Sequence, residues 1–177
     1  MKINTRQLAF DAMLAAMCAV LGYISLDMGN MKITFESLPI LLGALLFGPV
    51  DGFLIGLVGT GIYQILRYGV TATTVLWMLP YMVCGLLVGL YAKKRDFELT
   101  GIQVMLIVIA NELLITILNT GVMYIDSKIY GYYSFAYIFG STIIRLVICV
   151  VKATAFALIL PVLVKAVRKA LGEKTAR

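Results

Sequence analysis

Ionisable side chains inside two strongly apolar segments are the residues of this chain best placed to do chemistry. Arg145 and Lys152 lie seven residues apart in one segment, and Glu112 and Asn119 have the same separation in another. Seven residues make two helical turns, so each pair shares one face of its helix. A charge in hydrocarbon is costly, and such residues usually face the protein interior and mark functional sites. We therefore expect both faces to look into a helical bundle.

Counting residues from the helix ends predicts which of these side chains meet. Glu112 and Lys152 fall at the same depth, which predicts an ion pair. Asn119 and Arg145 share a layer about ten ångströms nearer the outside. Arg145 then has an amide neighbour but no acid in its layer, and an unpaired guanidinium is suited to clamp a ligand carboxylate. The structural alternative is that Arg145 pairs with Glu36 or with backbone carbonyls and only holds helices together.

Aromatic residues gather at the same outer level. Trp77 and Tyr81 share a helical face by their four-residue spacing, and Pro80 between them disturbs the backbone where a ligand could approach. This face would suit a small organic ligand, with Arg67 as a further cation at the outer end of its helix. Tyrosines at a membrane surface are usually interfacial anchors, and that interpretation stays open for the others nearby.

The composition places these residues in a membrane protein. Of the 177 residues, 62% are hydrophobic and only 14% are charged, whereas soluble domains are roughly 45–50% apolar. Each membrane crossing takes about 20 residues. We therefore predict one domain, residues 1–177, folded as an all-α membrane protein with a bundle of about six transmembrane helices.

Polar residues or Gly and Pro separate the expected spans. The spans cover residues 7–26, 35–48, 50–68, 73–92, 101–123 and 136–164. The second span is short and holds Glu36 and Pro39, which favours a tilted or partly broken helix. The first lacks a convincing cleavage site and is interpreted as a retained helix rather than a secretory signal.

Positively charged residues cluster on one side of the expected bundle. That side has Lys2, Arg6, the cluster 93–95 and the basic tail of about 165–177, and the other side has Lys32, Arg67 and Lys128. By the positive-inside rule both termini are cytoplasmic, in a multi-pass protein of the cell membrane. Anionic lipid head groups are a sufficient partner for the basic tail, so the net charge of +6 requires no nucleic acid.

Several kinds of chemistry are excluded or disfavoured. The chain has no histidine, and its three cysteines lie singly in apolar segments, so a His-based triad or a His-ligated metal site is excluded. The few acids form no paired catalytic motif, and no Gly-rich phosphate loop with Lys-Ser/Thr occurs. We predict a binding protein without catalytic residues, metal or cofactor of its own.

Small residues recur along the first span. Ala12, Ala15, Ala16 and Ala19 stand at three- and four-residue intervals, a spacing that lets another helix approach closely. That helix belongs either to the same bundle or to a separate membrane protein. The sequence leaves both interpretations open.

The whole chain resembles the substrate-binding S components of energy-coupling-factor (ECF) transporters, which import vitamins. The resemblance covers nearly all residues and rests on the short spans, the alanine spacing, the basic tail and one moderately specific segment. That segment is Leu-Leu-Gly-Ala-Leu-Leu-Phe-Gly-Pro over 41–49, followed by Asp51-Gly52.

The resemblance implies a division of labour. A vitamin would be captured from outside behind a gate between the first two helices, here Asp27 to Thr34 with Asn30 and Lys32. The alanines of the first helix would dock on a transmembrane scaffold subunit joined to two cytoplasmic ATPase subunits. ATP would then be used only by the partners, and the whole bundle would topple in the membrane to release its cargo.

The cationic side chains favour a carboxylate vitamin, and both pantothenate and folate carry one. The folate-binding branch usually shows a Pro-Tyr-Phe-Pro-Gly-Phe-Thr-like stretch after the third helix, whereas this chain reads Gly-Val-Thr-Ala-Thr-Thr-Val-Leu-Trp over 69–77. Pantothenate is therefore preferred, folate is second, and an uncharged hydroxymethylpyrimidine or pyridoxine-type vitamin is third. The expected substrate-binding residues are Arg67, Trp77, Tyr81, Asn119, Arg145 and Lys152.

Other classes of protein remain as alternatives. A self-sufficient small carrier or channel could use the layer of Glu112 and Lys152 as a relay. A purely structural membrane subunit would bind no ligand. An intramembrane enzyme is disfavoured because histidine and paired acids are lacking.

Overall fold

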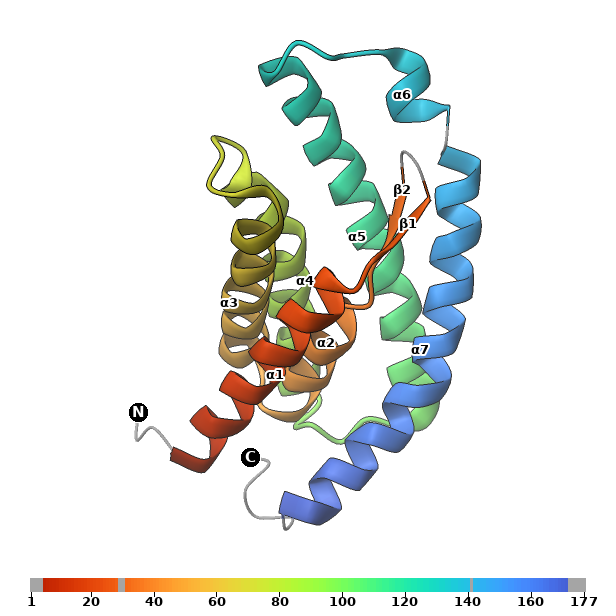
Figure 1. Ribbon diagram of the computed structural model, residues 1–177. Coiled ribbons are helices and arrows are strands. Elements are labelled where there is room, and N and C mark those ends of the chain that lie inside the picture. Colours follow the sequence, from red (N-terminus) through yellow and green to blue (C-terminus); the bar gives the residue numbers. More distant parts are fainter. Residues whose placement is uncertain (1–4, 29–30, 141, 172–177) are drawn as a thin grey trace.

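Most of the expected apolar runs are long helices in the computed structural model of the chain (Figure 1). The structure describes residues 5–28, 31–140 and 142–171, with the backbone alone over 26–28, 31, 32 and 171. Four segments are long and apolar enough to cross a membrane. They are α3 (Pro49–Tyr68), α4 (Thr74–Lys94), α5 (Gly101–Ile129) and the run Phe135–Ala170, which contains the short helix α6 (Phe135–Phe139) and most of α7 (Thr142–Leu171).

Two further helices complete the bundle. α1 (Thr5–Tyr23) precedes a hairpin of strands β1 (Leu26–Met28) and β2 (Met31–Ile33), and α2 (Ser37–Leu46) follows it. The strands pair antiparallel, with Asp27 opposite Lys32. Within the described residues, six helices of ten residues or more therefore form the fold, which confirms the predicted all-α six-helix bundle.

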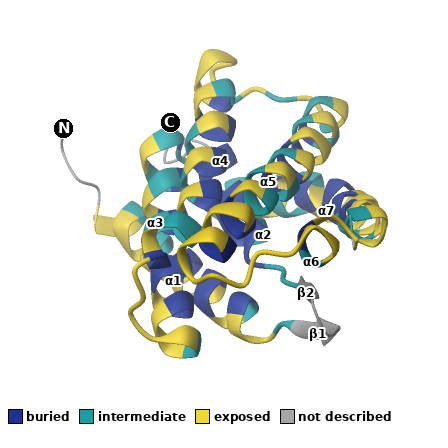
Figure 2. Ribbon diagram, turned by 90° about the horizontal axis from the view of Figure 1, so that it is seen from above, coloured by how far each residue is buried: buried dark blue, intermediate teal, exposed yellow. Residues whose placement is uncertain are grey.

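The helix α2 differs from the span predicted over 35–48. Ten residues rise about 15 Å, roughly half of the hydrocarbon thickness that a crossing must cover. Nine of its ten residues are buried, and Figure 2 shows α2 in the middle of the other helices. The apolar run is therefore a short helix at the core of the bundle rather than a full crossing, because neighbouring helices cover it all round.

Close helix contacts hold α1 to α4 together. Gly85 of α4 faces Gly52 of α3, where a Cβ on Gly85 would lie 2.3 Å from the Gly52 carbonyl oxygen. Gly59 of α3 meets Cys18 of α1 in the same way, with a Cβ 2.5 Å from the Cys18 Cβ. Small residues at such points let helix backbones approach within contact distance. The four helices thus form one tightly packed half of the molecule.

The Phe-Gly-Pro motif forms the turn between α2 and α3. Gly48 has a φ of 114°, a conformation open to glycine but strained for other residues. Pro49 follows as the first residue of α3, where its missing N–H costs no hydrogen bond. The motif therefore allows a reversal of direction without an intervening loop.

The long helices α5 and α7 pack on each other as the second half (Figure 1). α5 reaches Ile129, beyond the predicted end at 123, and α7 runs over 142–171 rather than 136–164. Polar residues follow Met123, but the helix continues to Ile129, and Gly131, with a φ of 74°, suits the position after the C-cap Tyr130. Asp126 consequently lies in a helix and not in a loop.

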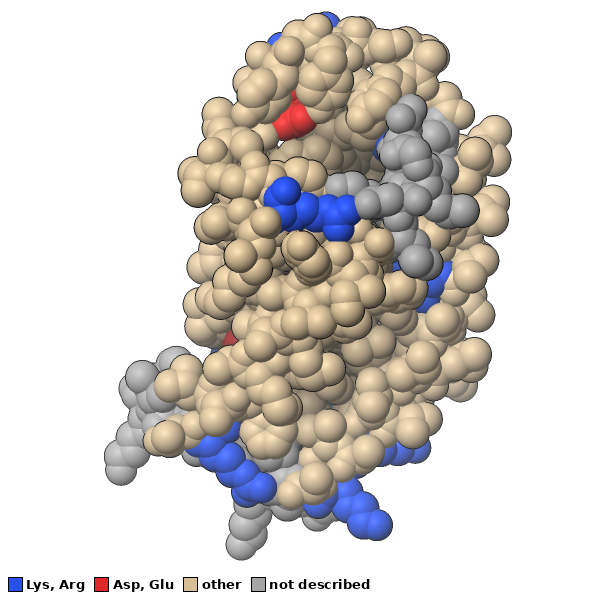
Figure 3. Space-filling model, viewed as in Figure 1, with Lys and Arg blue, Asp and Glu red and all other residues tan. Residues whose placement is uncertain are grey.

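Charge is distributed unevenly along the bundle. The first residues of α1 and the last residues of α7 lie at the same end of the molecule (Figure 1), and Lys and Arg gather there, while much of the side surface is uncharged (Figure 3). The basic residues of that end include Lys93, Lys94, Lys165 and Lys169. By the positive-inside rule, this is the end that we expect to face the cytoplasm.

Candidate functional site

A pocket of about 520 Å³ lies between the two halves and is lined by residues of both. These residues come from β2, α3, α4, α5, α6 and α7 and from the connections near them. Five of the six residues expected to bind substrate line it: Trp77, Tyr81, Asn119, Arg145 and Lys152. Its volume is within the range of small-molecule sites, roughly 300–1,000 Å³.

The predicted ion pair is present at the inner part of the pocket. The Lys152 ammonium lies 2.7 Å from Glu112 Oε2, and the Glu112 side chain is 0% exposed. The same ammonium donates to the backbone carbonyl of Thr34 at 3.4 Å. Because the pair neutralises itself and joins α5 to α7, Lys152 contributes no unpaired charge to a ligand.

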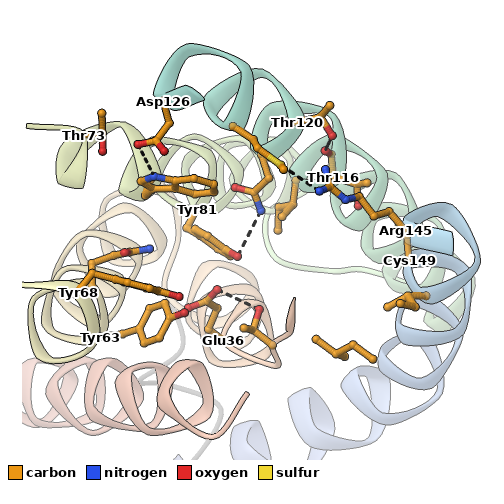
Figure 4. A pocket seen from close by; sticks show the side chains of 18 of the residues that line it. Glu36, Tyr63, Tyr68, Thr73, Tyr81, Thr116, Thr120, Asp126, Arg145 and Cys149 are labelled. Atoms are coloured by element: carbon orange, nitrogen blue, oxygen red, sulfur yellow. Dashed lines mark hydrogen bonds between the residues drawn. The ribbon is translucent and has the colours of Figure 1, made fainter. Parts of the chain in front are cut away.

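Arg145 on α7 lines the pocket on the side opposite Glu36 and Tyr81 (Figure 4). Its Nη2 donates to the Met123 sulfur at 2.9 Å, and a thioether is a weak acceptor. Within the part of the chain that the structure describes, no carboxylate forms an ion pair with this guanidinium. The expected alternative, a pair of Arg145 with Glu36, is not formed among these residues.

Glu36 and Tyr81 lie across the pocket from Arg145 (Figure 4). Glu36 precedes α2 and is only 2% exposed. Its Oε1 accepts a hydrogen bond from the Thr34 hydroxyl at 3.0 Å. Its Oε2 is buried without a hydrogen-bond partner among the described residues. Gly22 of α1 leaves room for this oxygen, since a Cβ there would lie 2.6 Å from it.

Asn119 approaches the same phenol from α5. Its Nδ2 donates to the Tyr81 hydroxyl at 3.4 Å, as the dashed line in Figure 4 marks. Its Oδ1 is buried and also has no partner among the described residues. Asn119 and Arg145, which we predicted to share a layer, thus line the same pocket, but no hydrogen bond joins them directly.

Trp77 is oriented by an acid that sequence reasoning missed. Its indole Nε1 donates to Asp126 Oδ1 at 3.3 Å, and the Tyr132 hydroxyl donates to the other oxygen of Asp126. Burial, and then the hydrogen bond to Asp126, raise the pKa of the Tyr132 phenol above its ordinary value. These bonds tie the connection after α5 to α4 across the outer end of the pocket.

Arg67 is not brought into this site. It is absent from the pocket lining, and its guanidinium donates to the Tyr23 backbone carbonyl at 2.9 Å and lies 6.0 Å from the centre of the Tyr23 ring. The residue therefore contacts the C-terminal end of α1. The prediction that Arg67 faces the ligand with the other cations has no support from this geometry.

The expected gate is the segment that forms β1 and β2. The backbone pairing of Asp27 and Lys32 is described, but their side chains and the whole of Asn30 lie outside the described residues. Ile33 and Thr34, which follow this hairpin, do line the pocket. The segment thus stands next to the candidate site.

The four alanines of α1 divide between two faces. Ala15 and Ala19 are buried, and the backbone of Ala15 contacts the glycine face of α3. Ala12 and Ala16 are exposed on the outer side of the bundle. Both interpretations of the stripe therefore apply, each to one pair of alanines, and only Ala12 and Ala16 are accessible to a partner.

Comparisons with known proteins place the chain in a family. The model of the family "ECF transporter, substrate-specific component" matches residues 6–173. Among sequence relatives, a UPF0397 protein of Lactobacillus johnsonii is 38% identical over 69 residues, 39% of this chain and 35% of that protein. One of Streptococcus thermophilus is 29% identical over 93 residues, 51% of this chain and 50% of that protein. The chain thus spans only a third to a half of the length of these relatives.

Solved structures share the fold. The S component for biotin from an ECF-type ABC transporter superposes with a TM-score of 0.71 at 16% identity, over 93% of this chain and 92% of that one. FolT bound with folic acid gives a TM-score of 0.62 at 21% identity, over 88% and 91%. The family match covers nearly the whole chain and identifies a multi-pass membrane protein. The chain belongs to the family of substrate-specific S components of ECF transporters.

Proposed function

We propose that this chain captures a small water-soluble vitamin carrying a carboxylate, and that Arg145 binds this carboxylate in the outer pocket. The observation that carries the proposal is a guanidinium that lines a pocket of about 520 Å³ and has, among the described residues, only a thioether as its hydrogen-bond acceptor. A charge held this deep in a membrane protein is stabilised once an anion joins it. Biotin and folic acid, named with two solved structures of the same fold, both carry carboxylates.

The opposite wall suits the body of such a ligand. Tyr63, Trp77 and Tyr81 all line the pocket and supply aromatic surface. The hydrogen bond from Trp77 to Asp126 fixes the indole and reduces the entropy that binding would cost. Pantothenate and folate both meet the requirement for a carboxylate and remain the two named candidates, with an uncharged pyrimidine or pyridoxine-type vitamin as the third.

Transport is proposed to depend on partners. The exposed face of α1 with Ala12 and Ala16 would dock on the transmembrane scaffold subunit, which is joined to two ATPase subunits that use ATP. The hairpin of β1 and β2, beside the pocket, would serve as the gate from the outside. The chain itself would then bind its ligand without hydrolysing anything.

A ligand panel tests the proposal. The purified chain in detergent is screened for thermal stabilisation by pantothenate, folate, biotin, pyridoxine and hydroxymethylpyrimidine, since a ligand that binds only the folded state raises its stability. We expect a carboxylate to give the largest shift, and Arg145→Ala to reduce its affinity at least about tenfold. Thr154→Ala, an exposed change on the same helix, is the control. Unchanged affinity in Arg145→Ala would remove this residue from the site.

A self-sufficient carrier is the second candidate, because the ion pair of Glu112 and Lys152 lies beside the pocket and could relay charge. Proteoliposomes that contain this chain alone separate the two functions. The importer subunit is expected to bind ligand without concentrating it inside. Concentrative uptake in the absence of partner proteins would establish the carrier instead.

A further inference from the structure

The connection between α5 and α6, residues 130–134, forms part of the pocket wall. It crosses the end of the bundle opposite the start of α1 (Figure 1). Tyr130 and Tyr132 of this connection line the pocket, yet they are 51% and 42% exposed. A segment that faces both the cavity and the outside separates the two. How firmly it is held therefore controls access to the pocket on this side.

Asp126 joins this connection to the other half of the bundle. It is 8% exposed and lies near the C-terminal end of α5. Its Oδ1 accepts a hydrogen bond from the Trp77 indole of α4 at 3.3 Å, marked in Figure 4, and its Oδ2 accepts one from the Tyr132 hydroxyl. Hydrogen bonds to a charged acceptor are roughly twice as strong as neutral ones. One carboxylate thus holds a helix and the connection together.

The other contacts of the connection are local. The Tyr132 ring packs edge-on against Tyr137 of α6, with ring centres 5.6 Å apart. The Lys128 ammonium of α5 lies 4.0 Å from the centre of the Tyr133 ring, a distance suited to a cation–π contact. These contacts join the connection to its own flanking helices, whereas Asp126 also binds a residue of α4.

We infer that Asp126 is a positioning residue that fastens the α5–α6 connection over the pocket by holding Trp77 and Tyr132 on one carboxylate. The orientation of the indole and the closure of this side of the pocket are then coupled. Loss of either donor lets the carboxylate rotate away from the other. This role goes beyond the proposed capture of a carboxylate vitamin, because it applies to the chain without a ligand.

The indole itself reports the first half of this coupling. Trp77 is the only tryptophan of the chain, so its fluorescence is read without interference from another indole. Quenching by acrylamide is measured on the purified full chain without ligand. We expect Tyr132→Phe to raise the quenching rate constant, although Tyr132 donates to Asp126 and not to the indole. Tyr91→Phe removes the same hydroxyl near the other end of α4 and should leave quenching unchanged.

Access to the pocket is measured at a cysteine of its lining. Cys149 is a free thiol, 3% exposed, on α7. Its labelling rate with sulfonatoethyl methanethiosulfonate is followed by mass spectrometry, and Cys149→Ala identifies its signal. We expect Asp126→Leu to raise this rate about tenfold to a hundredfold, as for an opening that no longer breaks hydrogen bonds to a charged group. Asp96→Asn, an exposed change in the connection after α4, should keep the parent rate.

A combined variant shows whether the two bonds act as one unit. Asp126→Leu with Tyr132→Phe should label no faster than Asp126→Leu alone, because one carboxylate carries both bonds. The thermal transition of each variant confirms that it is folded, and Asp126→Asn, which keeps one acceptor oxygen, replaces Asp126→Leu if that variant does not fold.

Three results would overturn the role of Asp126. They are parent-like quenching and labelling in a folded Asp126 variant, additive effects in the combined variant, and faster labelling of Tyr132→Phe without faster quenching. Because no vitamin is present in these measurements, each of them leaves the proposed capture of a carboxylate by Arg145 intact.

Discussion

The two halves of this bundle are built on different principles. Helices α1 to α4 touch through glycines, so that Gly85 meets the Gly52 backbone and Gly59 meets Cys18 at contact distance. Helices α5 and α7 are joined instead by a buried ion pair, Glu112 with Lys152 at 2.7 Å. Backbone contacts leave little room for alternative arrangements, whereas an ion pair on long side chains tolerates adjustment.

The pocket lies where these halves meet and draws on both. The glycine-packed half supplies Glu36, Trp77 and Tyr81, and the α5–α7 half supplies Asn119 and Arg145. A ligand that contacts both walls therefore links the halves across the site. The comparison suggests that stability resides mainly in the first half, while ligand binding depends on how the second half is held against it.

The largest loss of stability is expected when a glycine at the contact of α3 and α4 is replaced. Gly85→Leu should prevent accumulation of folded protein, because its Cβ would meet the Gly52 carbonyl carbon and oxygen, which cannot move aside. We expect a loss of at least about 3 kcal/mol in the free energy of unfolding. The measurement is the folded yield and the thermal transition in detergent.

Gly121→Leu is the matched control for that change. A Cβ at Gly121 of α5 meets nothing within 4 Å, so this variant should fold like the parent chain. Equal yields of Gly85→Leu and Gly121→Leu would mean that the close packing of α3 and α4 does not carry the stability of this half.

The next largest loss of stability is expected when the ion pair between α5 and α7 is broken. Lys152→Met leaves Glu112 buried with no cation, which should cost about 3 kcal/mol of stability. Replacing both residues, as Glu112→Gln with Lys152→Met, should restore most of this loss because no buried charge remains. Thermal unfolding of the single and double variants measures the difference. A double variant as unstable as the single one would show that the pair has a role beyond mutual neutralisation.

Substitutions on the two faces of α1 should change the stability of the isolated chain least. Ala15→Leu should destabilise it by about 1–2 kcal/mol, because Ala15 is 5% exposed and packs against α3. Ala12→Leu should leave stability and ligand affinity unchanged and weaken only the proposed assembly, read out by co-purification with an ECF scaffold subunit. Loss of stability in Ala12→Leu, or intact assembly with it, would contradict this division.

The sequence predicted much of the fold because apolar runs longer than a membrane crossing form helices in most contexts. It also predicted the pairing of Glu112 with Lys152, since charges in hydrocarbon must meet and helix length sets their depth. The buried position of α2 was missed. An apolar run of ten residues looks similar whether lipid or protein surrounds it, and only tertiary packing decides between them.

The site was harder to predict than the helices. Asp126 was overlooked because the apolar pattern ends at Met123 although α5 continues to Ile129. Arg67 was expected at the pocket but contacts Tyr23, because the rotation of α3 about its axis depends on its packing against α1 and α4. Glu36 lines the pocket because the segment before α2 packs against α1 and α4, and no sequence pattern carries that information.

The most direct test of the account is the coupling between Arg145 and the ligand acid. Affinities of the best carboxylate ligand and of its primary amide are measured for the parent chain and for Arg145→Gln, as a double-mutant cycle. We predict a coupling of about 1.5–3 kcal/mol, with the parent chain strongly preferring the acid and the variant nearly indifferent. A coupling near zero, with the acid still preferred in Arg145→Gln, would show that the carboxylate binds elsewhere.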